Sequence, residues 1–355
     1  MKDTVQTAVI GVTGYAGAEL ARLLLRHPRL KGRPPVFAGR VDAKDAARGG
    51  LPLTEIHPHL ADRNGSGELK LEPFSWELLT GRGVEVLFLA TPHEQSREWV
   101  PEALKRGLRV IDLSGAWRLT NRANRAVYAF TDDGTEHAAE TQAQAVYGMP
   151  ELYRAEIAGA KLIANPGCYP TSVILPVKPL VAAGLVDLEH GIVADSKSGV
   201  SGAGKAPTAK THFMYAADNL SAYGVFGHRH TGEMLEQIGL TPDQIVFTPH
   251  LLPIPRGILS TIYVRFIAPQ TAEKVSGVYH DFFARSPMVR IFDKTLPQIQ
   301  HVAHTSYADI GFQLSADGRR AVIVSCLDNL LKGASSQAVQ NMNVMLGWDE
   351  AEGLA

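Results

Sequence analysis

The stretch TAVIGVTGYAGAELARLLLRHP, from Thr7 to Pro28, joins a β-rich apolar run to an amphipathic helical pattern through a turn rich in glycine. Its leucines recur at helical spacing, and Pro28 ends the pattern. Gly11, Gly14 and Gly17 permit a tight turn and a close approach of the backbone to a pyrophosphate, which the positive end of a helix attracts. The stretch therefore predicts the opening strand, turn and helix of a dinucleotide-binding domain.

Short apolar runs alternate with helical patterns as far as about residue 165. Strands are predicted at Pro35–Arg40, Gly83–Pro92 and Leu108–Ser114, and a helix at Glu94–Gly107. Strands separated by helices at this spacing are typical of a parallel sheet.

Beyond Cys168 the chain becomes rich in strands joined by polar or Pro/Gly-containing segments, which predicts a second domain built on a mixed, mainly antiparallel sheet. Ser335–Trp348 predicts a closing helix that returns to the first domain. Ala61–Lys70 predicts a solvent-exposed loop.

The 355-residue chain has 45% hydrophobic and 20% charged residues and a formal net charge of −1, as in a globular protein with room for two domains. Because it has no polybasic segment, nucleic acid and anionic membranes are not expected partners. No apolar stretch approaches the roughly 18 residues of a membrane-spanning helix, and the start lacks the pattern of a secretory signal. Two cysteines provide no disulfide framework, so a cytoplasmic protein is expected.

The second predicted strand ends FAGR, which places Arg40 where an acidic residue usually binds the ribose 2′-hydroxyl of NAD. An arginine here accommodates the 2′-phosphate of NADP, and Asp42 comes two residues later. The alternative is that Arg40 is a solvated loop cation. The pattern favours NADP(H) as the cofactor.

A second glycine-rich stretch, GVSGAGKA at Gly199–Ala206, nearly matches the P-loop of nucleoside triphosphatases. Ala206 replaces the hydroxyl residue that would hold Mg²⁺, and such an enzyme would not explain the first glycine loop. The backbone amides beside Lys205 instead predict a nest for an anion.

The stretch ANPGCYPTS, Ala164–Ser172, places Cys168 on a sharp bend between two prolines and ahead of a helical run. A helix N-terminus stabilises a thiolate, so Cys168 is a candidate nucleophile, with the Asn165 amide three residues earlier. Cys326 lies in the apolar strand AVIVSCL and is predicted to be a core residue.

A nucleophilic thiol needs a base whose pKa lies near the working pH, which indicates histidine. His228 and His230 in GHRHTGE are the candidates, since glycines flank them and Glu233 lies near enough in sequence to orient an imidazole. A His-x-His pair also suits a metal, but no further ligands stand at a metal-site spacing, so no metal is predicted.

These motifs together resemble the N-acetyl-gamma-glutamyl-phosphate reductase family over nearly the whole chain. The matching motifs are GVTGYAG, LATPHE (Leu89–Glu94), VIDLSGAWRL (Val110–Leu119), YGMPEL (Tyr147–Leu152), ANPGCYPTS, SGVSGAGK (Ser198–Lys205), GHRHTGE and DNLLKGASSQAVQN (Asp328–Asn341). The family is similar to aspartate-semialdehyde dehydrogenases. The resemblance implies an α/β fold, with a Rossmann NADP-binding domain at residues 1–165 and 329–355. It also implies an α+β catalytic and oligomerisation domain with a mixed, mainly antiparallel sheet at residues 166–328.

The resemblance implies that Cys168 is the nucleophile and that His228 or His230 is the acid/base. It implies that Arg118 binds the substrate phosphate and Arg256 a substrate carboxylate, and Asn165 and Lys205 are further predicted substrate contacts. The predicted cofactor-binding residues are Gly11, Thr13, Gly14, Tyr15, Ala16, Gly17, Arg40, Thr91, Pro92 and Asn329. The chain departs from the family pattern at Gly232, where proline is usual, and at Gly115–Trp117, where Ala-Asp-Phe is common.

The resemblance implies an NADPH-dependent reductive dephosphorylation of a small acyl phosphate, N-acetyl-γ-glutamyl phosphate, to its semialdehyde through a cysteine thioester in arginine biosynthesis. It also implies a homodimer or homotetramer. The first alternative is a reductase of carrier-protein-bound 2-aminoadipyl phosphate from lysine biosynthesis, which the absence of a concentrated basic run disfavours. The second is an inactive NADP-sensing relative. A short-chain reductase is disfavoured because the chain has no Tyr-x-x-x-Lys pair.

Overall fold

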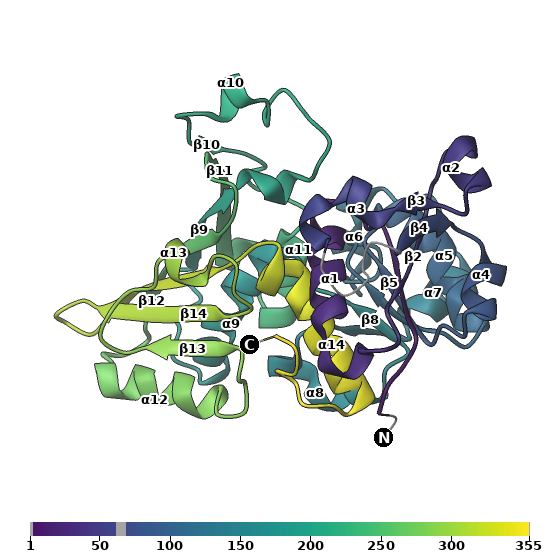
Figure 1. Ribbon diagram of the computed structural model, residues 1–355. Coiled ribbons are helices and arrows are strands. Elements are labelled where there is room, and N and C mark those ends of the chain that lie inside the picture. The colour runs from purple at the N-terminus through teal and green to yellow at the C-terminus, as the bar shows by residue number, and fades with distance from the viewer. Residues whose placement is uncertain (1–2, 62–68, 355) are drawn as a thin grey trace. The chain divides into compact units, whose positions relative to one another are not determined.

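The computed structural model describes residues 3–61 and 69–354, which form two compact units (Figure 1). The first unit comprises the described parts of Met1–Arg118, Asp132–Asn165 and Ser335–Ala355, and the second comprises Leu119–Thr131 and Pro166–Ala334. This division assigns residues 119–131 to the second unit, whereas the predicted boundary left them in the first. Most of the loop predicted at Ala61–Lys70 lies outside the described residues.

The first unit is built on an eight-stranded sheet in the order β3-β4-β2-β1-β5-β6-β8-β7. Every neighbouring pair is parallel except β3 and β4, which confirms the predicted parallel sheet. The strands are β1 (Thr7–Ile10), β2 (Val36–Gly39), β3 (Leu51–Pro52), β4 (Lys70–Pro73), β5 (Val86–Leu89), β6 (Arg109–Asp112), β7 (Ala145–Tyr147) and β8 (Leu162–Ala164). The strand order reverses at β1, and such a reversal creates a crevice for a ligand at the carboxyl ends of the strands.

Helices connect these strands on both faces of the sheet, because right-handed crossovers on either side of a reversal lie on opposite faces. They are α1 (Tyr15–Arg26), α2 (Ala43–Ala47), α3 (Leu53–Ile56), α4 (Trp76–Gly81), α5 (His93–Lys105), α7 (Glu136–Gln142), α8 (Pro150–Gly159) and α14 (Ser336–Leu346), with 3₁₀ turns η1 (Pro28–Leu30) and η2 (Pro58–Leu60). The first predicted strand is confirmed but ends at Ile10, because Gly11 adopts a φ of +95° and turns the chain.

The C-terminal helix α14 belongs to the first unit and lies beside α1 (Figure 1). Its buried amides donate hydrogen bonds to the rest of that unit. Gln337 Nε2 and Asn341 Nδ2 both donate to the Gly148 carbonyl, at 2.9 and 2.8 Å, and Asn341 Nδ2 also lies 2.9 Å from Asn165 Oδ1. The last helix therefore completes the domain that the first residues begin.

The second unit contains a seven-stranded sheet in the order β10-β11-β9-β12-β15-β14-β13. The pairs β9–β11 and β13–β14 are parallel and the others antiparallel, so the predicted mixed sheet is confirmed. The strands are β9 (Ile192–Gly199), β10 (Ser221–Ala222), β11 (Ile245–Leu252), β12 (Ile258–Arg265), β13 (Val289–Phe292), β14 (Ala308–Leu314) and β15 (Arg320–Leu327).

Helix α9 (Cys168–Ala182) packs on one face of this sheet. Along β12, buried residues that face α9 therefore alternate with more exposed ones on the opposite face. The unit's other helical segments are α6 (Arg122–Arg125), α10 (Phe213–Ala216), α11 (Thr231–Ile238), α12 (Ala272–Phe282), α13 (Ile299–Val302), the 3₁₀ turns η4 (Ala126–Tyr128), η5 (Val200–Ala203) and η6 (Pro242–Gln244), and a π-helical turn at Leu331–Ser335. Figure 1 shows α10 on a long excursion between β9 and β11.

Three fully buried serines connect α9 to the sheet. The Ser260 hydroxyl on β12 lies 2.7 Å from both the Ser172 hydroxyl on α9 and the Ser196 hydroxyl on β9. Ser172 in turn donates to the Tyr169 carbonyl at 2.8 Å. Buried hydroxyls are costly without partners, so this chain of bonds fixes the first turn of α9 on the sheet.

Replacing Ser260 with alanine should lower the free energy of unfolding by about 1–3 kcal/mol, because it leaves two buried hydroxyls short of a partner. Urea unfolding followed by fluorescence would measure the loss. The control is Thr261→Val, which also deletes one hydroxyl but on the opposite face of β12. Equal losses of the free energy of unfolding in the two variants would contradict the stabilising role of the three serines.

Candidate active site

The glycine turn after β1 forms one side of a cavity of about 560 Å³ in the first unit. Among the predicted cofactor residues, this cavity gathers Gly11, Thr13, Gly14, Arg40, Thr91 and Pro92 at the ends of β1, β2 and β5. Tyr15, Ala16 and Gly17 lie in the first turn of α1, beside this lining. Asn329 belongs to the second unit, where its side chain accepts from the Gly257 amide at 2.8 Å and donates to the Ser201 hydroxyl at 2.9 Å.

The geometry of the glycine turn fits a dinucleotide. A Cβ on Gly17 would stand 2.1 Å from the Gly11 carbonyl oxygen, and a Cβ on Gly11 would stand 2.3 Å from the Ala90 carbonyl oxygen, so both positions require glycine. A Cβ on Gly14 would meet only the Gly11 oxygen, at 3.6 Å, so glycine there leaves the cavity wall open. Helix α1 starts beside it with no side-chain cap, which leaves the positive end of the helix dipole available to a phosphate.

The end of β2 distinguishes the two nicotinamide cofactors. Arg40 is exposed and lines the cavity, where a guanidinium suits a 2′-phosphate. The Asp42 carboxylate accepts from the Asp45 amide at 2.8 Å and caps α2. The acidic side chain nearest in sequence is thus engaged in a helix cap, which favours NADP(H).

A second cavity, of about 630 Å³, lies in the second unit and contains the predicted nucleophile and both predicted histidines. Its lining comes from α9, the end of β9, the excursion that carries α10, and the loop before α11. The lining residues include Cys168, Tyr169, Ser198, Gly199, Thr208, Lys210, Thr211, Tyr215, Asn219, Tyr223, His228, Arg229, His230 and Val127.

Two glycines make room around Cys168, which is the first residue of α9. A Cβ on Gly167 would stand 2.6 Å from His230 Nε2, and a Cβ on Gly333 would stand 2.7 Å from the Cys168 Cβ. The Pro-Gly bend therefore lets the His230 imidazole lie directly against the turn that carries the thiol. The N-terminus of the 15-residue α9 favours the thiolate form of a cysteine at this position.

The two histidines occupy different environments. His230 is buried and immediately precedes α11, whereas His228 is half-buried and its Nδ1 accepts the His230 backbone amide at 3.1 Å. Burial, and then the nearby charge of Arg229, lowers the pKa of His228 to about 4. His228 is therefore neutral near pH 7, with its proton on Nε2, and it fixes the backbone of His230.

The fully buried Glu233 contacts the turn that carries Cys168. Its Oε2 accepts the Gly167 amide at 2.9 Å, one residue before Cys168. The sequence suggested only that Glu233 could orient an imidazole. Its hydrogen bond with the Gly167 amide forms because α11 folds against α9, and no pattern near Glu233 in the sequence predicts it.

Two tyrosines that sequence reasoning missed also line the cavity. Tyr223 OH lies 3.3 Å from Tyr169 OH, which donates to the His250 carbonyl at 2.9 Å. Burial raises the pKa of both phenols, so both hydroxyls stay protonated as hydrogen-bond donors. Tyr169 follows the predicted nucleophile in sequence, which was the only available signal.

The predicted substrate contacts are spread over both units. Arg118 is buried in the first unit, where its Nε and Nη2 each donate at 2.7 Å, to the carbonyls of Asn165 and Leu113. In the second unit, Arg256 Nη1 lies 3.4 Å from Asp328 Oδ2, and Lys205 is exposed. Within the second unit, neither Lys205 nor Arg256 lines the Cys168 cavity, whose cationic lining residues are Lys210 and Arg229.

Over residues 3–61 and 69–354, no cluster of three or more histidine, cysteine or acidic side chains is arranged to hold a metal ion. Within the same ranges, no helix has both the length and the apolar character needed to cross a bilayer.

The chain matches known families in two parts. Residues 6–160 match the model "Semialdehyde dehydrogenase, NAD binding domain", and residues 168–329 match "Semialdehyde dehydrogenase, dimerisation domain". Aspartate semialdehyde dehydrogenase II of Vibrio cholerae has a similar structure, with a TM-score of 0.69 and 18% identity over 97% of this chain and 98% of that one. Aspartate semialdehyde dehydrogenase with NADP from Candida albicans gives a TM-score of 0.64 at 14% identity, covering 96% and 98%. The two domains and the fold define a protein of the semialdehyde dehydrogenase class.

Relatives of higher identity narrow this class. A protein from Desulfotalea psychrophila is 42% identical over 356 residues, which cover 99% of this chain and 98% of the relative. One from Methanocaldococcus jannaschii is 40% identical over 351 residues, covering 98% and 97%. Both are named N-acetyl-gamma-glutamyl-phosphate reductase. The chain belongs to the N-acetyl-gamma-glutamyl-phosphate reductase family.

The low pKa of His228 should make folding depend on pH. Its pKa is about 4 in the folded chain and near the ordinary 6.5 when unfolded, so between these values the unfolded chain binds more protons. The free energy of unfolding should therefore fall as the pH is lowered from 6.5 to 4. His228→Asn, which keeps an acceptor for the His230 amide, should flatten this slope in urea unfolding measured at several pH values. The same replacement at exposed His301 is the control, and an unchanged slope for His228→Asn would contradict the assignment.

Proposed function

We propose that this chain catalyses the NADPH-dependent reduction of N-acetyl-γ-glutamyl phosphate to N-acetylglutamate semialdehyde, with release of phosphate, as a step of arginine biosynthesis. The observation that carries the proposal is the position of the His230 imidazole against Gly167, next to a cysteine that begins a helix. The substrate is supported by the shared name of relatives about 40% identical over nearly the whole chain.

The first half of the reaction forms a thioester on Cys168. The thiolate attacks the acyl carbonyl, a carbon–sulfur bond forms, and the bond to the phosphate oxygen breaks. The start of α9 stabilises the thiolate, and His230 takes the proton of the thiol. Since an acyl phosphate is already activated, no nucleoside triphosphate is needed.

The second half reduces the thioester to the aldehyde. When bound in the cavity lined by Gly11, Gly14, Arg40 and Thr91, NADPH supplies the hydride. His230 returns a proton to the sulfur as the carbon–sulfur bond breaks, which regenerates the cysteine. His228 acts by holding the His230 backbone, and Glu233 acts by holding the Gly167 amide.

Arg118, Asn165, Lys205 and Arg256 remain predicted substrate contacts. Arg118 Nε also donates to the Asn165 carbonyl, and we propose that this hydrogen bond additionally holds the chain that leads to Cys168. The alternatives, a carrier-protein-bound 2-aminoadipyl phosphate reductase and an inactive NADP-sensing relative, find no specific observation in their favour.

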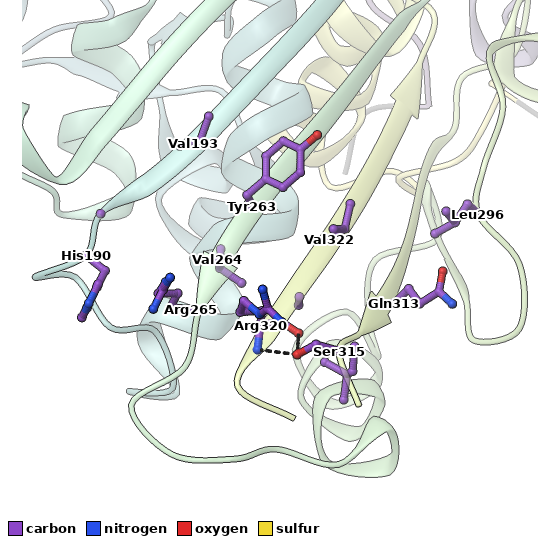
Figure 2. Close-up of a pocket in the computed structure, with 13 residues that line it drawn as sticks. His190, Val193, Tyr263, Val264, Arg265, Leu296, Gln313, Ser315, Arg320 and Val322 are labelled. Carbon is purple, nitrogen blue, oxygen red and sulfur yellow. Dashed lines mark hydrogen bonds between the residues drawn. The ribbon is translucent and has the colours of Figure 1, made fainter. Parts of the chain in front are cut away.

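We propose that the chain acts as a homo-oligomer whose basic unit is a dimer built on the second sheet, and that a tetramer would pair two such dimers. The face of that sheet opposite α9 contains a shallow cavity of about 550 Å³, lined by apolar side chains such as Val193 and Val322 and by polar ones such as Arg265 and Gln313 (Figure 2). Val193, Tyr263 and Leu296 on this face are 41%, 46% and 39% exposed. Because the family model over residues 168–329 is named a dimerisation domain, a second copy of this chain is the partner that the face fits.

We also propose a cytoplasmic location. Cys326 is a buried core residue in β15, where burial raises the pKa of its thiol to about 12, and neither cysteine forms a disulfide. A catalytic thiol that must stay reduced suits a reducing compartment.

The test of the proposed function is phosphate-dependent reduction of NADP⁺ by N-acetylglutamate semialdehyde. Cys168→Ser should lower turnover by about 10³-fold or more while NADPH binding is retained, because the hydroxyl is a far weaker nucleophile. The control is Cys326→Ala, which should keep turnover. Reduction driven only by 2-aminoadipate or aspartate semialdehyde, or full activity in Cys168→Ser, would overturn the proposal.

A charge on the outer sheet face should separate the proposed dimer. Val193→Glu combined with Tyr263→Glu should shift the mass measured by light scattering to that of a monomer, because it buries two carboxylates without partners. The control is Phe213→Glu, on the α10 excursion, where the side chain is 75% exposed. Dissociation by the control variant alone would assign the interface to α10 instead.

A further inference from the structure

Helix α11 holds a short chain segment that belongs to the second unit although both of its flanks belong to the first. This segment, Leu119–Thr131, contains α6 and η4, and α6 lies against α11. The contact depends on two residues of α11, Gly232 and Glu236.

Glu236 binds the segment with both carboxylate oxygens. Oε2 accepts from the Thr120 amide and the Thr120 hydroxyl, each at 2.8 Å. Oε1 accepts from the Asn121 amide at 3.1 Å and from Asn124 Nδ2 at 3.0 Å. Four donors saturate the acceptor sites of a carboxylate, so Glu236 is fully committed to this segment.

Gly232 lets the segment approach α11 closely. A Cβ on Gly232 would stand 3.0 Å from the Asn124 Cβ and 3.1 Å from Leu119 Cδ1. Gly232 lies in the first turn of α11, and the absence of a side chain there lets Asn124 and Leu119 pack close to the helix backbone. Gly232 is also a position where the chain departs from the family motif.

The docked segment forms part of the wall of the Cys168 cavity. Val127, in η4, lines that cavity and is 49% exposed. Three parts of the site therefore depend on α11. His230 immediately precedes the helix, Glu233 in its first turn accepts the Gly167 amide, and Glu236 one turn later binds the segment that carries Val127.

We propose that Gly232 and Glu236 are positioning residues that dock residues 119–128 on α11, and that Val127 is a specificity-determining residue that contacts the apolar part of the acyl group. This inference rests on the proposed function, because it names the contact that the N-acetylglutamyl chain makes in the Cys168 cavity. The nucleophile and base do not depend on the docked segment.

The test measures the KM of each substrate in phosphate-dependent NADP⁺ reduction. Val127→Ala, Glu236→Gln and Gly232→Ala should each raise the KM for N-acetylglutamate semialdehyde about tenfold, since a lost apolar contact typically changes discrimination by that order. The KM for phosphate and for NADP⁺, kcat, and the rate at which iodoacetamide inactivates Cys168 should stay within about twofold. The control is Glu273→Gln, in the exposed first turn of α12, which should change none of these.

A double variant separates positioning from general loss of structure. If Glu236 acts through Val127, Glu236→Gln combined with Val127→Ala should raise KM no further than either change alone. The inference would be overturned if the rises in KM of the two single variants multiplied in the double variant. It would also be overturned if every KM rose and kcat fell together in these variants. Absence of phosphate-dependent turnover in the unaltered protein would instead refute the proposed function, while normal turnover with unchanged KM in the three variants would refute only this inference.

Discussion

The hydrogen bond from the Gly167 amide to the buried Glu233 carboxylate joins two segments 66 positions apart in the chain. A buried carboxylate is stable only when its oxygens are satisfied, so this contact fixes α11 against the start of α9. The imidazole of His230 then lies where a side chain at residue 167 would be. The closeness of the His230 imidazole to the turn that carries Cys168 thus depends on one carboxylate and on the missing side chain of Gly167.

Local patterns were enough to predict the parts of the molecule that depend on neighbouring residues. The strand, glycine turn and helix at Thr7–Arg26, and the bend before Cys168, follow from φ requirements and apolar spacing within a few residues. The family resemblance extended this to both domains of the fold. Residues 119–131 stay within the predicted first domain along the chain but pack in the second compact unit, because Glu236 on α11 accepts their hydrogen bonds.

The lining of the Cys168 cavity could not be predicted from the sequence for the same reason. His228 and His230 are the same residue type in one motif, and only burial and the hydrogen bond between them separate a fixed neutral imidazole from one beside the thiol. Lys210 lies on an excursion with no recognisable pattern, and the hydrogen bonds of Arg118 to the backbone carbonyls of Asn165 and Leu113 have no local signal either. At the cofactor site, Asp42 became interpretable only when its role as a helix cap was visible.

Helix α14 has a consequence for how the molecule is made. Its buried amides donate hydrogen bonds to the Gly148 carbonyl and the Asn165 side chain, yet the ribosome makes this helix only after the whole second unit. While the second unit is being made, the first unit therefore lacks α14, and the Gly148 carbonyl and the Asn165 side chain lack the hydrogen bonds that α14 donates. A chain cut short after residue 334 would therefore contain the complete second unit but a first unit that lacks α14.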